Sequence, residues 1–111
     1  MSTLPQANQR TLDTPFGQAV GASYRWEGGQ YCAIHTARGI VGCGLFDVAC
    51  ANEFGMALAI AKGTPQQPLC EPEDLYQAKI VAVSEAAAGF GVTQGMTGMQ
   101  ALEKMLAEPS S

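Results

Sequence analysis

Charged side chains are scarce in this sequence. Asp, Glu, Lys and Arg make up 14% of its 111 residues, against roughly 25% in an average soluble domain. A folded monomer of this length exposes about 5,800 Å² of surface, so the few charges lie far apart on it. The chain is also rich in alanine and has 13 glycines, small residues that allow close packing. We therefore expect part of the surface to be buried in a homo-oligomer.

Basic residues and long apolar runs are equally few. The six lysines and arginines are scattered along the chain, whereas nucleic-acid binding needs bases clustered against the phosphates. No apolar run approaches the ~20 residues that cross a bilayer. The first ten residues are polar and lack the apolar core of a signal peptide. The sequence predicts a cytoplasmic protein with neither a nucleic-acid partner nor a membrane segment.

The C-x-x-C spacing of zinc ribbons and thioredoxin-like sites is absent. His35, Cys43 and Cys50 could together supply three metal ligands, but structural zinc sites rarely lack the short paired spacing. We expect no metal and no cofactor, and reduced thiols in the cytoplasm. The four cysteines are Cys32, Cys43, Cys50 and Cys70.

The N-terminal part of the sequence shows an alternation of apolar and polar residues. Residues 1–15 are polar and show no period, which predicts a flexible leader before a single domain over 16–108. Residues 18–26 then alternate between apolar and polar with the period of a half-buried strand. A Gly-Gly pair at 28–29 predicts a hairpin, and further strands are expected at 31–36 and 40–43. These three strands form an antiparallel meander.

The period then changes to that of helices. Residues 45–54 place their apolar side chains on one helical face, and 56–62 alternate again as a strand. The segment 72–90 begins with Pro-Glu-Asp, which suits a helix start. It continues with the apolar stripe Ile80, Val83, Ala87 and Phe90.

A capping box at Thr97–Gln100 opens a last helix. The predicted order is β-β-β-α-β-α-α. We expect an α+β fold, a two-layer α/β sandwich with all helices on one face of the sheet.

Two sequence blocks carry a family resemblance. The stretch GIVGCGLFDV at 39–48 and the stretch GMTGMQAL at 95–102 resemble the signature of the YunC-like proteins, small bacterial and archaeal chains of unknown function. The resemblance covers roughly residues 16–106. It implies an α/β fold and a β-rich N-terminal region through which subunits form tetramers. It implies no reaction.

Cys43 is the leading candidate for chemistry. It lies between two glycines at the start of the expected helix, where the helix dipole lowers a thiol pKa. We therefore expect Cys43 to be the most acidic of the four cysteines. His35, the only histidine, could act as its base, and Asp47 could provide a polar group beside it. The alternative is that Cys43 is a small packing residue and Asp47 complements the helix dipole.

Two glycine-containing loops are candidates for ligand binding. Gly42 and Gly44 lie in a strand-to-helix loop whose N–H groups could hold an anion, and Gly95 with Thr97 could do the same. The alternatives are a tight turn and a helix cap. Two hypotheses follow. The first is a homo-oligomeric small-ligand-binding or assembly module. The second is a cysteine-dependent enzyme that uses Cys43.

Overall fold

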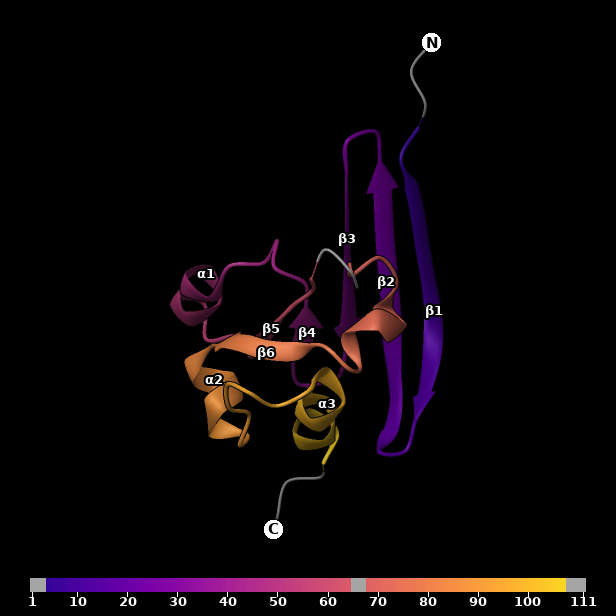
Figure 1. Ribbon diagram of the computed structural model, residues 1–111. Helices are drawn as coiled ribbons and strands as arrows, with labels where there is room; N and C mark the ends of the chain where they lie inside the picture. Colours follow the sequence, from indigo (N-terminus) through magenta and orange to yellow (C-terminus); the bar gives the residue numbers. More distant parts are fainter. Residues whose placement is uncertain (1–3, 65–67, 108–111) are drawn as a thin grey trace.

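The computed structural model describes residues 4–64 and 68–107. Residues 1–3 of the expected leader and residue 108 at the expected domain end lie outside the described residues. The elements follow in the order β1 (Gln6–Thr14), β2 (Gly17–Trp26), β3 (Gly29–His35), β4 (Ile40–Gly42), α1 (Val48–Glu53), β5 (Leu58–Lys62), η1 (Pro72–Leu75), β6 (Lys79–Val83), α2 (Glu85–Gly89) and α3 (Gly98–Leu106) (Figure 1). In the described part of the chain, no helix is long and apolar enough to cross a membrane.

One six-stranded sheet with strand order β1-β2-β3-β4-β5-β6 forms the centre of the molecule. Strands β1 to β4 are an antiparallel meander, which confirms the expected N-terminal arrangement. Strand β5 pairs with β4 in parallel, and α1 makes the connection between them. Strand β6 then pairs antiparallel with β5. The carboxyl ends of β4 and β5 therefore lie at the same edge of the sheet.

The expected leader is largely a strand. Residues Gln6–Thr14 pair along their whole length with β2, from Gln6↔Arg25 to Thr14↔Gly17. The sequence prediction missed this strand because its side chains are almost all exposed, with Leu12 the one buried residue. A strand that buries neither face shows no hydrophobic period.

The helix expected over 72–90 is three separate elements. It divides into η1, strand β6 and the short helix α2. Ile80, Val81 and Val83 favour the extended chain through their β-branched side chains, and Ser84 caps a new helix by accepting from the Ala87 N–H. The helix expected over 45–54 is also shorter, because Asp47 caps it and it begins at Val48.

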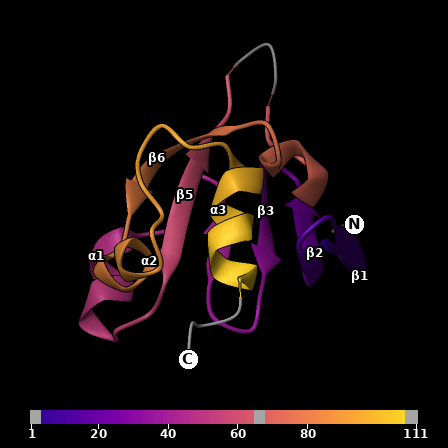
Figure 2. The ribbon, with the colours of Figure 1, turned by 90° about the horizontal axis from the view of Figure 1, so that it is seen from below.

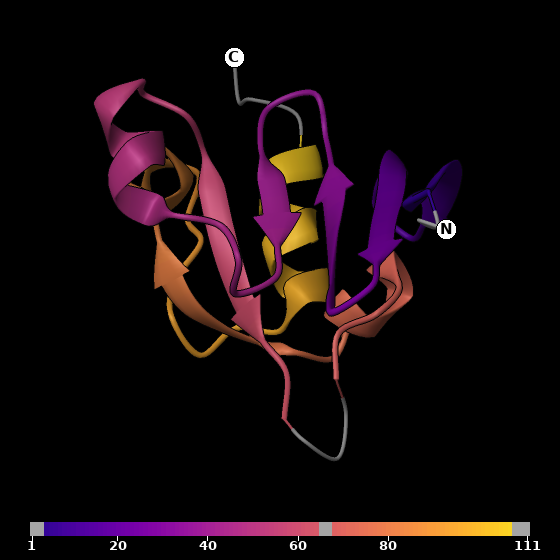
Figure 3. The same cartoon turned by 90° about the horizontal axis from the view of Figure 1, so that it is seen from above.

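Helices lie on both faces of the sheet at β5, rather than on one face as the two-layer arrangement required. Leu58 and Ile60 pack with Ala51 of α1. Ala59 and Ala61, on the other face, belong to the main core with α2 and α3. Figure 2 shows α3 over one face of the sheet, and Figure 3 shows α1 on the opposite face. Both faces of β5 are apolar, so both require a covering layer.

Candidate functional site

Two cysteines lie side by side where β3 and β4 meet. The register Ala33↔Gly42 places Cys32 opposite Cys43 in the next pair. The Cys43 N–H donates to the Cys32 carbonyl oxygen at 3.2 Å, so this is a hydrogen-bonded pair of the ladder. The two side chains project from the same face of the sheet, into the core with α3. Cys32 is fully buried and Cys43 is 7% exposed.

The two thiols share a hydrogen bond that makes them unequal. The Cys32 S–H donates to the Cys43 sulfur, which lowers the pKa of Cys43 to about 5. Burial opposes this shift, and the backbone N–H of Leu45 supports it. The same hydrogen bond, together with desolvation, raises the pKa of Cys32. Cys43 is the thiolate of the pair, because it is the sulfur with additional N–H donors and the closer of the two to solvent.

Cys43 lines a cavity at the edge where β4 and β5 end. The cavity has a volume of about 480 Å³ and is bordered by Gly44, Lys62, Leu69 and Gln30, among others. Lys62 contributes a positive charge at the end of β5. A second hollow of about 650 Å³ shares Lys62 and extends along η1 to Lys79. Ligand sites of open α/β sheets occur at this position, outside the carboxyl ends of parallel strands.

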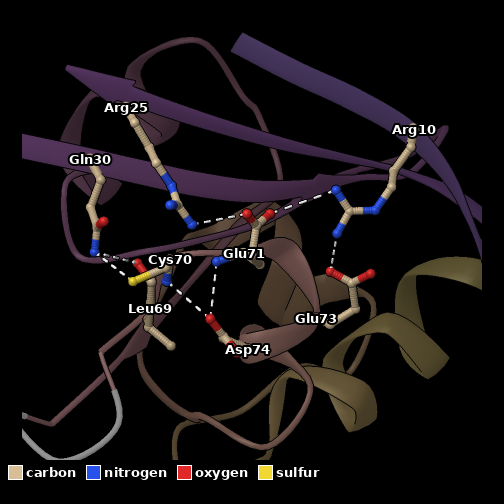
Figure 4. Close-up of polar contacts among 8 residues, drawn as sticks. All are labelled: Arg10, Arg25, Gln30, Leu69, Cys70, Glu71, Glu73 and Asp74. Carbon is tan, nitrogen blue, oxygen red and sulfur yellow. Dashed lines mark hydrogen bonds and ion pairs between the residues drawn. The ribbon is translucent and has the colours of Figure 1, made fainter. Parts of the chain in front are cut away.

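A polar cluster holds the segment 69–75 against strands β1 to β3 (Figure 4). The Glu71 carboxylate pairs with Arg25 at 2.9 Å and with Arg10 at 3.6 Å, and Arg10 also pairs with Glu73. The Asp74 carboxylate accepts from the Glu71 N–H at 3.0 Å and from the Cys70 N–H at 3.1 Å.

The amide of Gln30 completes this cluster from β3. Its nitrogen donates to the Cys70 sulfur at 2.8 Å. Segment 69–75 borders both hollows through Leu69, and it borders the larger one also through Glu73 and Asp74. The arginine pairs therefore fix a wall of the site from strands that are distant in sequence.

The other residues expected beside Cys43 are elsewhere. His35 pairs with Ile40, three positions along the ladder from Cys43, which is about 10 Å. Alternation also places its side chain on the opposite face. Asp47 caps α1 through the Ala49 N–H at 3.0 Å. Within the described residues, no three His, Cys, Asp or Glu side chains gather as metal ligands.

The glycines expected to bind a ligand lie in two places. Gly44 borders the Cys43 cavity, with open space around its Cα, whereas a Cβ at Gly42 would meet the Phe46 ring. Gly95 and Thr97 lie beside β6: the Gly95 N–H donates to the Ile80 carbonyl, and Thr97 caps α3 in the expected capping box. These contacts are those of a turn and a helix cap.

Cys32 and Lys62 are the residues that sequence reasoning missed. In the sequence, Cys32 looks like an ordinary buried residue of a strand. Only the β3–β4 register shows that it lies opposite Cys43. Sequence reasoning could have found the pair by aligning the expected strands 31–36 and 40–43 across the short turn between them. To place Lys62 beside Cys43, sequence reasoning would have had to predict that β5 runs parallel to β4.

The helix dipole is not what lowers the pKa of Cys43. Helix α1 begins five residues after Cys43 and is six residues long, so its dipole does not act directly on the sulfur. The direction of the pKa shift agrees with the expectation. Its largest cause is the neighbouring thiol of Cys32.

The comparisons with known proteins concern fold and family. A search of curated proteins found no match. The fold is similar to the crystal structure of a protein of unknown function from Thermoplasma acidophilum, with a TM-score of 0.78 over 95% of this chain and 98% of that one, at 15% sequence identity. Residues 42–105, more than half of the chain and including Cys43, match a family described as Domain of unknown function (DUF1805). The chain belongs to this family of unknown function.

Proposed function

We propose that the protein carries out cysteine-dependent chemistry with Cys43 as the nucleophile. The observation that carries this proposal is the Cys32–Cys43 thiol pair at a cavity beyond the carboxyl ends of β4 and β5. A thiolate is the reactive form of cysteine, and a neighbouring thiol that donates a hydrogen bond maintains that form. Lys62 in the same cavity favours a substrate with negative charge or an electron-rich oxygen, consistent with a small anionic ligand.

The test is alkylation of folded protein by iodoacetamide at pH 5.5 and pH 7.0, read peptide by peptide. With a pKa near 5, the thiolate fraction of Cys43 falls by less than about twofold between these pH values, whereas that of a free cysteine falls about thirtyfold. The ratio of the two rates is independent of how easily the reagent reaches the sulfur. A thirtyfold fall at Cys43, or no labelling while the exposed Cys50 reacts, would contradict the proposal.

A second proposal is self-association, to a tetramer, through the N-terminal strands. It is supported by an open aromatic face, which we define as the β2–β3 surface carrying Tyr24, Trp26 and Tyr31. Trp26 is 44% exposed, whereas Tyr24 and Tyr31 are half-buried and Phe46 packs edge-on against Tyr31. Tyr24 stacks on Tyr31 at 4.6 Å between ring centroids, and Trp26 lies 6.0 Å from Tyr31. In the described part of the chain, α1 is the helix on this face, and it lies over β5 rather than β2 and β3 (Figure 3).

The narrower assignments are also proposals. Membership of the YunC-like group rests on the two sequence blocks at 39–48 and 95–102. A cytoplasmic location rests on the free thiols of Cys32 and Cys43, since a reducing compartment maintains that state. The small anionic ligand rests on Lys62 and Lys79, which border the adjoining hollows.

A further inference from the structure

We propose that small hydroperoxides are the substrates of this thiol site, and that Cys32 closes a reversible Cys32–Cys43 disulfide after each one is reduced. This inference rests on the proposed nucleophilic role of Cys43 and names the substrate class and the second reacting group. Three features of the structure support it: the register of the two cysteines, their unequal burial, and the surroundings of Cys32.

The register places the two sulfurs where a disulfide can form. Hydrogen-bonded partners of an antiparallel ladder have Cα atoms about 5.5 Å apart, and disulfides span about 4.4–6.8 Å between Cα atoms. The Cys43 N–H to Cys32 carbonyl bond shows that Cys32 and Cys43 are such partners. Bond formation therefore requires rotation of the side chains rather than movement of the strands.

The difference in burial between the two cysteines decides which of them an oxidant meets first. Cys43 borders the cavity, while Cys32 is 0% exposed, so an oxidant that enters reaches Cys43 first. Cys43 itself is only 7% exposed, so a small oxidant reaches its sulfur more easily than a protein partner does. Cys50 is on α1, which covers the opposite face of the sheet, and this location excludes it as the partner thiol.

The reaction balances in two steps. The Cys43 thiolate attacks the terminal oxygen of a hydroperoxide ROOH. An S–O bond forms, the O–O bond breaks, and the leaving alkoxide takes a proton from water to give ROH. Cys43 is now a sulfenic acid, oxidised by two electrons. The Cys32 sulfur then attacks the Cys43 sulfur, the S–S bond forms, and hydroxide leaves with the Cys32 proton as water. Two equivalents of a small thiol restore the dithiol by exchange.

The surroundings of Cys32 suit this second step. Ser23 lies opposite Cys32 on β2, so Ser23, Cys32 and Cys43 form a row across three strands. The Ser23 hydroxyl is buried and has no hydrogen-bond partner among the described residues. It is the neighbouring donor that can stabilise the Cys32 sulfur as its proton leaves. The Ser23→Ala variant should therefore form the sulfenic acid at the normal rate and close the disulfide more slowly.

The experiment is the anaerobic addition of one equivalent of tert-butyl hydroperoxide to the full chain at pH 7, followed by peptide mapping. The wild type should lose two thiols per hydroperoxide and yield an intramolecular Cys32–Cys43 disulfide. Cys32→Ser should lose one thiol, and its Cys43 sulfenic acid should be trapped by dimedone. Cys50→Ser, which changes a thiol on the opposite face of the sheet, is the matched control and should behave as the wild type does.

Three results would overturn the inference: a Cys43–Cys70 bond, bonds between chains, or oxidation of Cys43 without loss of Cys32. If Cys43 is alkylated at pH 5.5 but hydroperoxide forms no disulfide, this inference fails and the proposed nucleophile remains. If neither reagent modifies Cys43, both fail. Circular dichroism checks the fold of each variant, and the wild-type peptide map decides the question even where a variant does not fold.

Discussion

At the scale of single residues, the site depends on a difference between two chemically identical side chains. Cys32 and Cys43 differ in burial and in the N–H groups around them, and these differences decide which sulfur keeps the proton. The sequence shows that Cys43 lies between glycines, and it predicts the direction of the pKa shift. The partner, Cys32, follows only from the register of β3 against β4, which the short turn between them fixes.

The lowered pKa makes a prediction about stability. The pKa of Cys43 is about 5 in the folded protein and about 8.5 in an unfolded chain. Its contribution is therefore fully present above the unfolded value and is lost as the pH falls through the folded one. We expect the free energy of unfolding of the wild type to exceed that of Cys43→Ser by a margin that grows from pH 5 to pH 8. The growth is at most about 1.4 kcal/mol per pH unit.

Urea denaturation of both proteins across this range measures the margin. Cys50→Ser, which changes an exposed thiol, is the control and should show no such growth. A margin that stays constant with pH would mean that Cys43 is protonated in the folded protein.

At the scale of elements, the sequence predicts those whose apolar residues follow a regular period, but it misses strand β1 and misassigns the segment 72–90. Strands β2 to β4 each contain consecutive buried residues, and helix α3 buries one face. Each of these elements was predicted near its true position. Strand β1 buries only Leu12 and was missed. The Ile80, Val83, Ala87 and Phe90 stripe has helical spacing by coincidence, because it joins a strand and a helix across Ser84.

Ser84 links three elements and should be sensitive to substitution. Its buried hydroxyl donates to the Met56 carbonyl at 2.8 Å and accepts from the N–H groups of Leu58 at 2.8 Å and Ala87 at 3.3 Å. Ser84→Ala leaves these groups unsatisfied and should cost about 2–4 kcal/mol of unfolding free energy. Thr97→Ala, which removes a cap at an exposed helix end, should cost about 1 kcal/mol. Equal losses in urea denaturation would refute this account of Ser84.

Gly98 is the second sensitive position among the elements. A Cβ there would overlap the Leu75 carbonyl oxygen, whereas Gly89, in α2, has open space around its Cα. We expect Gly98→Ala to lower the midpoint of thermal unfolding strongly, because the backbones of α3 and η1 must separate. Gly89→Ala should be neutral or stabilising by up to about 1 kcal/mol. A Gly98→Ala protein as stable as the wild type would show that α3 does not pack this closely on η1.

At the scale of the whole molecule, the exposed surface is large. It amounts to 6757 Å², compared with about 5,800 Å² for a typical monomer of this size. The molecule is elongated, at 55 × 28 × 28 Å, and the β1–β2 hairpin extends beyond the helices (Figure 1). Long exposed edge strands such as β1 pair readily with another chain. The shape therefore supports the proposed assembly through the N-terminal strands.

Self-association should depend on the open aromatic face. Aromatic anchors at interfaces contribute about 2 kcal/mol or more each, so Tyr24→Ser should weaken assembly about thirtyfold, and Tyr24→Ser together with Trp26→Ser about a thousandfold. Phe54→Ser removes an aromatic that is 68% exposed at the end of α1, and it should leave assembly unchanged. Light scattering across a concentration series measures the mass. A wild-type mass equal to that of one chain would contradict the proposal.

The measurement that tests the central claim most directly is a titration of thiolate ultraviolet absorbance, with the Cys43→Ser signal subtracted from that of the wild type. Because Cys43 carries the charge of the pair, the difference should rise in a first step with a midpoint near pH 5. A difference that first appears near pH 8.5, the range of an ordinary cysteine, would show that Cys43 is protonated at neutral pH and would contradict its role as the nucleophile.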